Sequence, residues 1–200
     1  IDKGHPNSMN NYACMLRDGQ GVPVDYEGAI KYFKMAIDQG HPNSMNNYAC
    51  MLRDGRGVPV DPEGAIKYFK MAIDKGFVPA MNNYANMLRD GEGVEMNKSS
   101  AAEYYKIGIS KNDAESKLNY GKMLISMKES ESKVYEGIKY IKESADGGNV
   151  DAMYEYATAV HKMKINPKYE EEAILYYQKA IEHGHQKSRE ALQLIINNEE

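Results

Sequence analysis

The chain repeats itself every 36 residues, and this period restricts its fold more than any other feature. The first two units differ at three positions only, and the third keeps the same frame. A repeat this short cannot bury a core alone, so we expect residues 1–200 to stack into a single domain without linkers. The units span residues 4–39, 40–75, 76–111, 112–147 and 148–183, with an incomplete unit at 184–200.

Each unit has the pattern of two amphipathic helices, which we call helix A and helix B. In the second unit, Pro42 suits the start of helix A, Gly55 its end, and Asp61 the N-cap of helix B. We expect helix A near 42–54 and helix B near 62–75. The chain should be all-α, with at least ten helices in antiparallel pairs and no sheet. The apolar face of helix A falls at i, i+3, i+4 and i+7: Met45, Tyr48, Ala49 and Leu52.

Two tyrosine series also follow the period, and small residues accompany them. Ala49 and Ala72 should let neighbouring helices approach closely, and a larger residue there should overpack the core. One series belongs to helix A: Tyr12, Tyr48, Tyr84, Tyr120 and Tyr156. The other belongs to helix B: Tyr32, Tyr68, Tyr104, Tyr140 and Tyr176.

These residues resemble the Sel-one-like repeat (SLR) family, relatives of the tetratricopeptide repeats. The resembling pattern is A-x3-Y-A-x2-L-x2-G-x-G-V, followed by an Asp, the apolar series of helix B and a Gly. It reads through residues 45–76, with Met45 where the family more often has Ala. The resemblance implies a right-handed α/α superhelix that acts as an adaptor in multiprotein complexes, often fused to other domains.

The fourth and fifth units depart from this pattern at the connector between their helices. The glycine positions hold Met127 and Glu129, and then Met163 and Ile165. The turns in these two units must therefore differ from the first three.

Composition argues against several classes of function. The net charge of −4 disfavours non-specific nucleic-acid binding. There is no signal-peptide pattern and no long apolar run, so we expect neither secretion nor membrane insertion. Cys14 and Cys50 occupy equivalent positions in stacked repeats, roughly 10 Å apart by helix spacing, which is too far for a disulfide. Free thiols fit a reducing compartment, so we expect a cytoplasmic location.

The sequence has no convincing catalytic or metal-binding motif. It lacks a Walker loop, an H-E-x-x-H motif and a C-x2-C pair. His5 and His41 lie in Gly-His-Pro turns, where a capping or surface role is expected. His183 and His185 have no evident third ligand for a metal. We therefore expect no enzyme activity, no catalytic residue, no metal and no cofactor.

A run of asparagines on helix A is the candidate binding feature. Asn is a mediocre helix former, so its repetition in mid-helix needs an explanation. In the tetratricopeptide fold, helix A lines the concave groove, where amides can bond a peptide backbone and arginines a carboxylate. The alternative is structural: amides such as Asn47 bond the next repeat, and Asp54 neutralises Arg53. The candidate binding residues are Asn10, Asn46, Asn82, Asn43, Asn86, Arg17, Arg53 and Arg89.

The fourth and fifth repeats break this strip, because Leu118 and Tyr154 stand where Asn46 lies in the second. We therefore expect the helix-A face to be rich in amides in the early repeats and more apolar in the later ones.

Three functions remain open. The first is a scaffold that binds a peptide or partner protein on its concave face. The second is a regulatory or structural arm of a larger polypeptide whose activity lies in another domain. The third is a β-lactam hydrolase-like enzyme, an activity described for cysteine-rich family members. Those members carry a cysteine pair in each repeat, and this chain does not.

The two ends of the chain give a further expectation. Residues 1–4 copy 73–76, the end of a helix B, so we expect the chain to begin within a repeat. Met9, Tyr12 and Leu16 should then face a missing helix and favour self-association. At the other end, a last helix near 187–197 should turn Leu192, Ile195 and Ile196 inward.

Overall fold

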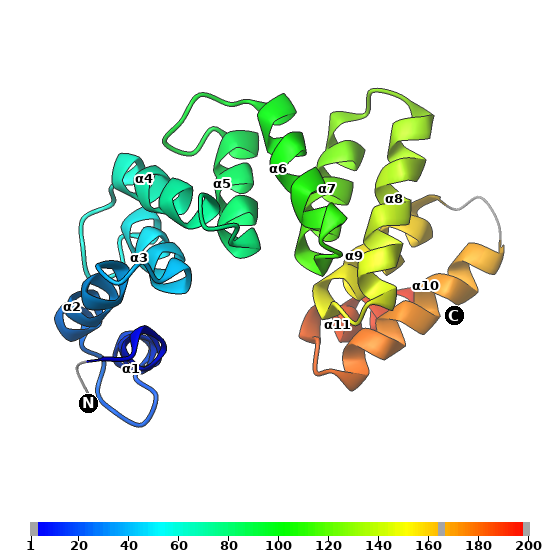
Figure 1. The fold of residues 1–200 in the computed structure, drawn as a ribbon. Helices are drawn as coiled ribbons and strands as arrows, with labels where there is room; N and C mark the ends of the chain where they lie inside the picture. The colour runs from blue at the N-terminus through cyan, green and yellow to red at the C-terminus, as the bar shows by residue number, and fades with distance from the viewer. Residues whose placement is uncertain (1–3, 164–166, 198–200) are drawn as a thin grey trace. The chain divides into compact units, whose positions relative to one another are not determined.

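A computed structural model describes residues 4–163 and 167–197, and within these ranges it contains eleven helices and no strand (Figure 1). The prediction of an all-α chain is confirmed. The chain forms two compact units, one up to Tyr104 and the other from Tyr105 onward. The helices are α1 Pro6–Asp18, α2 Tyr26–Ile37, α3 Pro42–Asp54, α4 Pro62–Ile73, α5 Val78–Asp90, α6 Lys98–Ser110, α7 Ala114–Met127, α8 Glu131–Asp146, α9 Val150–Met163, α10 Pro167–Glu182 and α11 Gln186–Asn197.

The helix boundaries follow the capping residues. In the second repeat, Pro42 occupies the first turn of α3, and Gly55 ends the helix in the left-handed region at φ 69°. The Asp61 carboxylate accepts a hydrogen bond from the Gly64 backbone N–H at 2.9 Å and begins α4. Helix A has the predicted bounds, and helix B ends at Ile73, two residues before the predicted Lys75.

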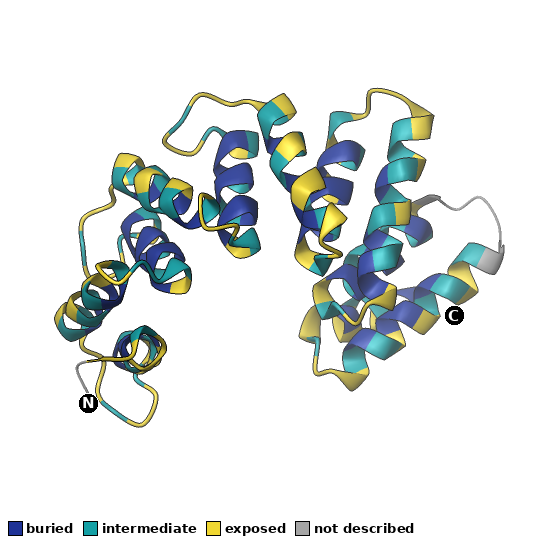
Figure 2. Cartoon of the chain, in the orientation of Figure 1, coloured by how far each residue is buried: buried dark blue, intermediate teal, exposed yellow. Residues whose placement is uncertain are grey.

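Small residues fill the crossing between the helices of each repeat. Ala49, Ala65 and Ala72 are completely buried, and buried residues line the inner faces of the helices (Figure 2). In the fourth repeat, glycines replace the alanines at the crossing of α7 and α8. A Cβ added to Gly121 would lie 2.5 Å from the carbonyl oxygen of Gly137, so this crossing excludes any side chain.

The two tyrosine series meet inside every repeat. The ring planes of each pair are steeply inclined, in the edge-to-face arrangement that aromatic quadrupoles favour. The centroid distances are 4.9 Å for Tyr12–Tyr32, 4.9 Å for Tyr48–Tyr68, 5.3 Å for Tyr84–Tyr104, 5.3 Å for Tyr120–Tyr140 and 4.7 Å for Tyr156–Tyr176.

A lysine from the preceding helix B covers the ring of the helix-A tyrosine. Lys34 lies 5.3 Å from the ring centre of Tyr48. This cation–π contact repeats at the period of 36 residues and joins each repeat to the next. We did not predict these contacts from the sequence, although the lysines recur every 36 residues. The other contacts are Lys70–Tyr84 at 5.4 Å, Lys106–Tyr120 at 5.7 Å and Lys142–Tyr156 at 4.8 Å.

The two connector glycines do different work. Gly55 adopts a left-handed conformation that ends helix A. Gly57 also has a positive φ, and its backbone lies against the preceding repeat. A Cβ at Gly57 would lie 2.2 Å from the Cβ of Tyr26, and one at Gly93 would lie 2.0 Å from the Cβ of Pro62. The second glycine of the connector is therefore required for repeats to stack.

The connector of the fourth repeat differs, as predicted. Lys128 takes the left-handed position at φ 50°, and α8 begins at Glu131. Residues 128–130 replace the longer link seen at 55–61 in the second repeat. In the fifth repeat, the predicted departure at Ile165 lies outside the described residues.

The prediction for the first helix was wrong for Met9 and Leu16 but fits Tyr12, which is half-buried, whereas Tyr48 and Tyr84 are 6% and 7% exposed. Met9 is 1% exposed and Leu16 6% exposed, because these side chains face helix B of their own repeat. Met15 is also open, at 37% exposed, whereas its equivalents Met51 and Met87 are completely buried. Self-association through this face stays a prediction.

In the last helix, the inward assignment holds for two residues of three. Ile195 is buried, and Leu192 packs against the core of the second unit. Ile196 is 47% exposed and was assigned wrongly, because it is turned by about 100° around the helix from the buried Ile195.

Histidines act as helix N-caps at two equivalent positions. His41 Nδ1 accepts from the Ser44 backbone N–H at 3.3 Å, and His185 Nδ1 accepts from the Ser188 N–H at 3.2 Å. The ring of His41 also reaches the preceding repeat, with its Nε2 2.7 Å from Asn7 Oδ1. His5 is exposed and makes no capping bond. The expected capping and surface roles are confirmed.

The connector geometry predicts unequal effects of two matched substitutions. Gly21→Ala introduces a side chain at a positive φ but meets nothing within 4 Å, so we expect a loss of about 1 kcal/mol. Gly57→Ala has the same backbone strain and also clashes with Tyr26, which should add about 1–3 kcal/mol. Urea unfolding followed by circular dichroism measures both, and equal losses would contradict a stacking role for Gly57.

The His41 cap predicts a dependence of stability on pH. Burial, and then the nearby His5, lower the pKa of His41 below its ordinary value. The unfolded chain therefore binds a proton more readily than the folded one. The stabilisation from His41 is present above the unfolded pKa of about 6.5 and declines as the pH falls below it. We expect His41→Asn, which can cap without titrating, to lose less stability than wild type between pH 8 and pH 5. Parallel pH profiles would contradict this.

Candidate functional site

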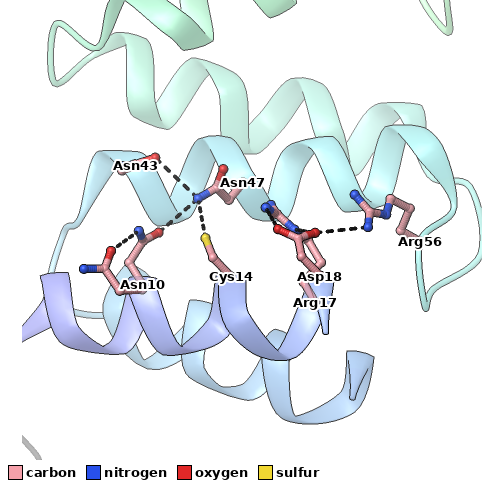
Figure 3. A network of polar contacts seen from close by, with 8 residues as sticks. Asn10, Cys14, Arg17, Asp18, Asn43, Asn47 and Arg56 are labelled. Atoms are coloured by element: carbon pink, nitrogen blue, oxygen red, sulfur yellow. Dashed lines mark hydrogen bonds and ion pairs between the residues drawn. The ribbon is translucent and has the colours of Figure 1, made fainter. Parts of the chain in front are cut away.

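The asparagines of helix A form a ladder between successive repeats (Figure 3). The Asn47 amide nitrogen donates to Asn10 Oδ1 at 3.0 Å, and it lies 3.5 Å from the sulfur of Cys14 and 3.4 Å from Asn43 Oδ1. The Ser44 hydroxyl also donates to Asn10 Oδ1, at 3.1 Å. Asn10 thus accepts two hydrogen bonds from the next repeat.

The same rung recurs one repeat later. The Asn83 amide donates to Asn46 Oδ1 at 2.9 Å and lies 3.7 Å from the sulfur of Cys50. Asn10, Asn46 and Asn82 are 4%, 8% and 1% exposed. Asn10 and Asn46 bond the next repeat in the way that the structural alternative describes, and ligand binding by the predicted amides stays a prediction.

The arginines of the predicted set are held by their neighbouring aspartates. Arg17 makes a two-pronged contact with Asp18, at 2.8 Å from Nε and 2.6 Å from Nη2. This contact lowers the pKa of Asp18, with a smaller contribution from Arg56 of the next repeat. Arg53 and Arg89 contact Asp54 and Asp90 in the same way, at 2.6 Å each.

The remaining positions on this face are partly open. Asn43 is exposed and Asn86 is half-buried. Cys14 and Cys50 are half-buried and form no disulfide, as predicted. Burial raises the pKa of the Cys14 thiol, which disfavours the reactive thiolate. The face of the first unit can form hydrogen bonds but has no activated nucleophile at Cys14.

The equivalent positions in the second unit border a hollow of about 540 Å³. Glu115 and Asp151 correspond in register to Asn43, and Lys122 corresponds to Cys50. The hollow therefore lies on the helix-A face. Its lining comes from α7, α9, α11 and the turns before α9 and α11: Glu115, Leu118, Asn119, Lys122, Asn149, Asp151, Tyr154, Glu155, His185 and Lys187.

Charge is unevenly paired within this hollow. Lys122 and Glu155 form an ion pair at 2.7 Å. His185 Nε2 lies 3.6 Å from the Asp151 carboxylate, a contact that is ionic only when the ring is protonated. Partial burial raises the pKa of Glu115, and the nearby charges of Asp113 and Asp151 raise it further. Glu115 thus sits in a region of excess negative charge.

The later repeats do not present the predicted apolar face at this point. Leu118 is only 6% exposed, and Tyr154 packs its ring 5.0 Å from His185. The accessible positions around them carry acids and lysines. The prediction considered only the residues that replace Asn46 in the later repeats. It overlooked the charged residues three or four positions away on the same helix face.

Other chemistry finds little support in the described part of the chain. Residues 4–163 and 167–197 contain no cluster of three or more His, Cys, Asp or Glu side chains able to hold a metal ion. His185 is a cap, and the predicted absence of a His183–His185 metal pair stays a prediction. Among the described helices, none combines the length and apolarity needed to cross a bilayer.

Several solved structures resemble this chain. A protective antigen of uropathogenic Escherichia coli with an SLR fold is 25% identical, with a TM-score of 0.70 over 95% of this chain and 41% of the antigen. This chain therefore spans less than half of that relative. A Sel1 repeat protein from Oxalobacter formigenes is 24% identical, with a TM-score of 0.79 over 92% of this chain and 75% of its own. An immunity protein from Pseudomonas aeruginosa is 20% identical, with a TM-score of 0.68 over 92% and 67% of the two chains.

Sequence comparison places the repeats in a family. No curated protein sequence matches the chain significantly. The sequence pattern of the Sel1 repeat matches residues 6–41, 42–77, 78–113 and 165–185. Residues 114–164, which hold most of the fourth repeat and about the first half of the fifth, lie outside these matches. Sel1 repeat proteins generally act as protein-interaction scaffolds, and their fold is typically non-catalytic. The matches cover more than half of the chain, which belongs to the Sel1 repeat family.

Proposed function

We propose that this protein is a non-catalytic scaffold that binds a partner protein or peptide on its helix-A face. The observation that carries the proposal is the hollow in the second unit, which is bordered by three successive A helices, α7, α9 and α11. Binding sites are concave, and side chains from neighbouring elements converge on them. Here the converging groups are carboxylates, amines, an imidazole and a phenol, which are all suited to contacts with peptides.

The first unit has a helix-A face of its own, with different side chains. The buried amides of Asn10 and Asn46 bond the next repeat and hold the A helices in register, and the outer positions form the surface that a ligand would contact. The accessible members of the predicted set are Asn43, Asn86, Arg17, Arg53 and Arg89, of which the arginines are already oriented by aspartates. Each amide contact contributes about 0.5–1.5 kcal/mol net, so several must act together to bind a ligand.

The scaffold role predicts that binding is lost by blocking helix A and not helix B. Asn119→Arg places a bulky cation in the hollow, and Ser132→Arg makes the same kind of change on the exposed first turn of α8. A partner isolated with the wild-type protein should bind Asn119→Arg at least tenfold more weakly, about 1.4 kcal/mol. It should bind Ser132→Arg with unchanged affinity in calorimetry. The proposal fails if both variants bind like wild type, or if Ser132→Arg alone loses the partner.

A further inference from the structure

Three hollows adjoin along the helix-A face of the second unit. The first is the 540 Å³ hollow described above. A second of about 280 Å³ lies between α9, α10 and α11, and a third of about 220 Å³ lies between α7, α8 and α9. Tyr154 lines the first and second, Lys122 and Glu155 line the first and third, and Thr158 and Lys162 line the second and third. The three hollows therefore adjoin through shared lining residues, and together we call them the groove.

The two ends of this groove differ in chemistry. At one end, Glu115 has no hydrogen bond or ion pair among the described residues, and the charges that perturb it most are those of two other acids. The aromatic ring of Tyr154 lines the same end. A carboxylate and an aromatic ring that line the same hollow suit an ammonium or guanidinium group, which can gain both an ion pair and a cation–π contact.

The other end is apolar and open. Leu194 is 65% exposed and lines the second hollow together with Ala191 and Tyr177. Ile125 and Ala159 line the third. A large aliphatic side chain left two-thirds exposed beside a hollow gives an apolar ligand group a surface to cover.

We propose that this groove binds a peptide segment that carries a lysine or arginine together with an apolar side chain. The basic side chain lies against Glu115 and Asp151, and the apolar one covers Leu194. This inference rests on the proposed scaffold function and specifies the chemistry of its partner.

Helix electrostatics account for only part of the arrangement. Glu115 and Asp151 lie in the first turns of α7 and α9, where acids stabilise a helix without any ligand. That effect explains neither the hollow that the two acids share nor the exposed Leu194 at its far end. A basic–apolar ligand explains all three features.

The test uses an array of random decapeptides probed with the whole chain, with the strongest binders then measured in solution by fluorescence anisotropy. We expect binders enriched in peptides that contain both a basic and an apolar residue. Replacing the basic residue by alanine should weaken binding about tenfold, and added salt should reduce the difference.

Matched variants locate the contact. Glu115→Gln combined with Asp151→Asn removes both charges without changing side-chain size, and it should weaken the basic peptides about tenfold. Glu27→Gln combined with Glu63→Gln makes a comparable change in the first turns of α2 and α4, and it should have no effect. Leu194→Asn should weaken binding about threefold. Circular dichroism checks that each variant is folded.

The outcomes separate this inference from the scaffold function. One outcome is that peptides bind the wild-type chain, fail to bind the Asn119→Arg variant and show no enrichment in basic residues. That result would overturn the inference and leave the scaffold function standing. Binders that keep their affinity for the Glu115→Gln, Asp151→Asn variant would also overturn it. If no peptide binds, and no partner discriminates Asn119→Arg from wild type, both proposals fail.

Discussion

The contact on which the structure depends is the tyrosine pair inside each repeat with a lysine of the preceding repeat above it. An edge-to-face pair contributes about 0.5–1.5 kcal/mol beyond simple burial, and an exposed cation–π contact about 0.5–1 kcal/mol. Tyr48, Tyr68 and Lys34 form one such group, with the rings 4.9 Å apart. The pair fixes the two helices of a repeat against each other, and the lysine fixes that repeat against its neighbour. One small set of side chains therefore determines both levels of the architecture.

The amide ladder adds directional bonds to this packing. Apolar contacts tolerate small sliding movements, whereas the bond from Asn47 to Asn10 at 3.0 Å specifies one register. Burying an amide is costly unless it is bonded, so a shifted repeat would leave Asn10 without its two donors. These bonds thus specify the register of the repeats in the first unit as well as stabilising them. They thereby also fix the positions of the outer residues on the helix-A face.

Much of the fold followed from the sequence because its signals are local and repeated. The period of 36 residues, the Asp61 cap and the Gly55 stop each depend on neighbouring residues, and they placed the second-repeat helices within two residues of their bounds. The candidate site was harder to predict, because a helix face can be partly covered by the next repeat. The sequence alone did not distinguish Asn46, which is buried, from Asn43, which is exposed. The hollow at Glu115 and Asp151 was missed because it joins residues 36 positions apart, and no single repeat contains it.

The near-identity of the first two repeats has a consequence for how the chain reaches its native pairing. Because α2 and α4 share almost the same sequence, α1 can bury the same apolar face against either one. The native partner closes a loop over residues 19–25, whereas the exchanged partner closes one over 19–61. Loop-closure entropy favours the shorter link by only about 1.6 kcal/mol. In the early repeats, the native helix pair is therefore selected by chain connectivity rather than by side-chain chemistry. At high protein concentration, the same helices can also pair between two chains that exchange hairpins.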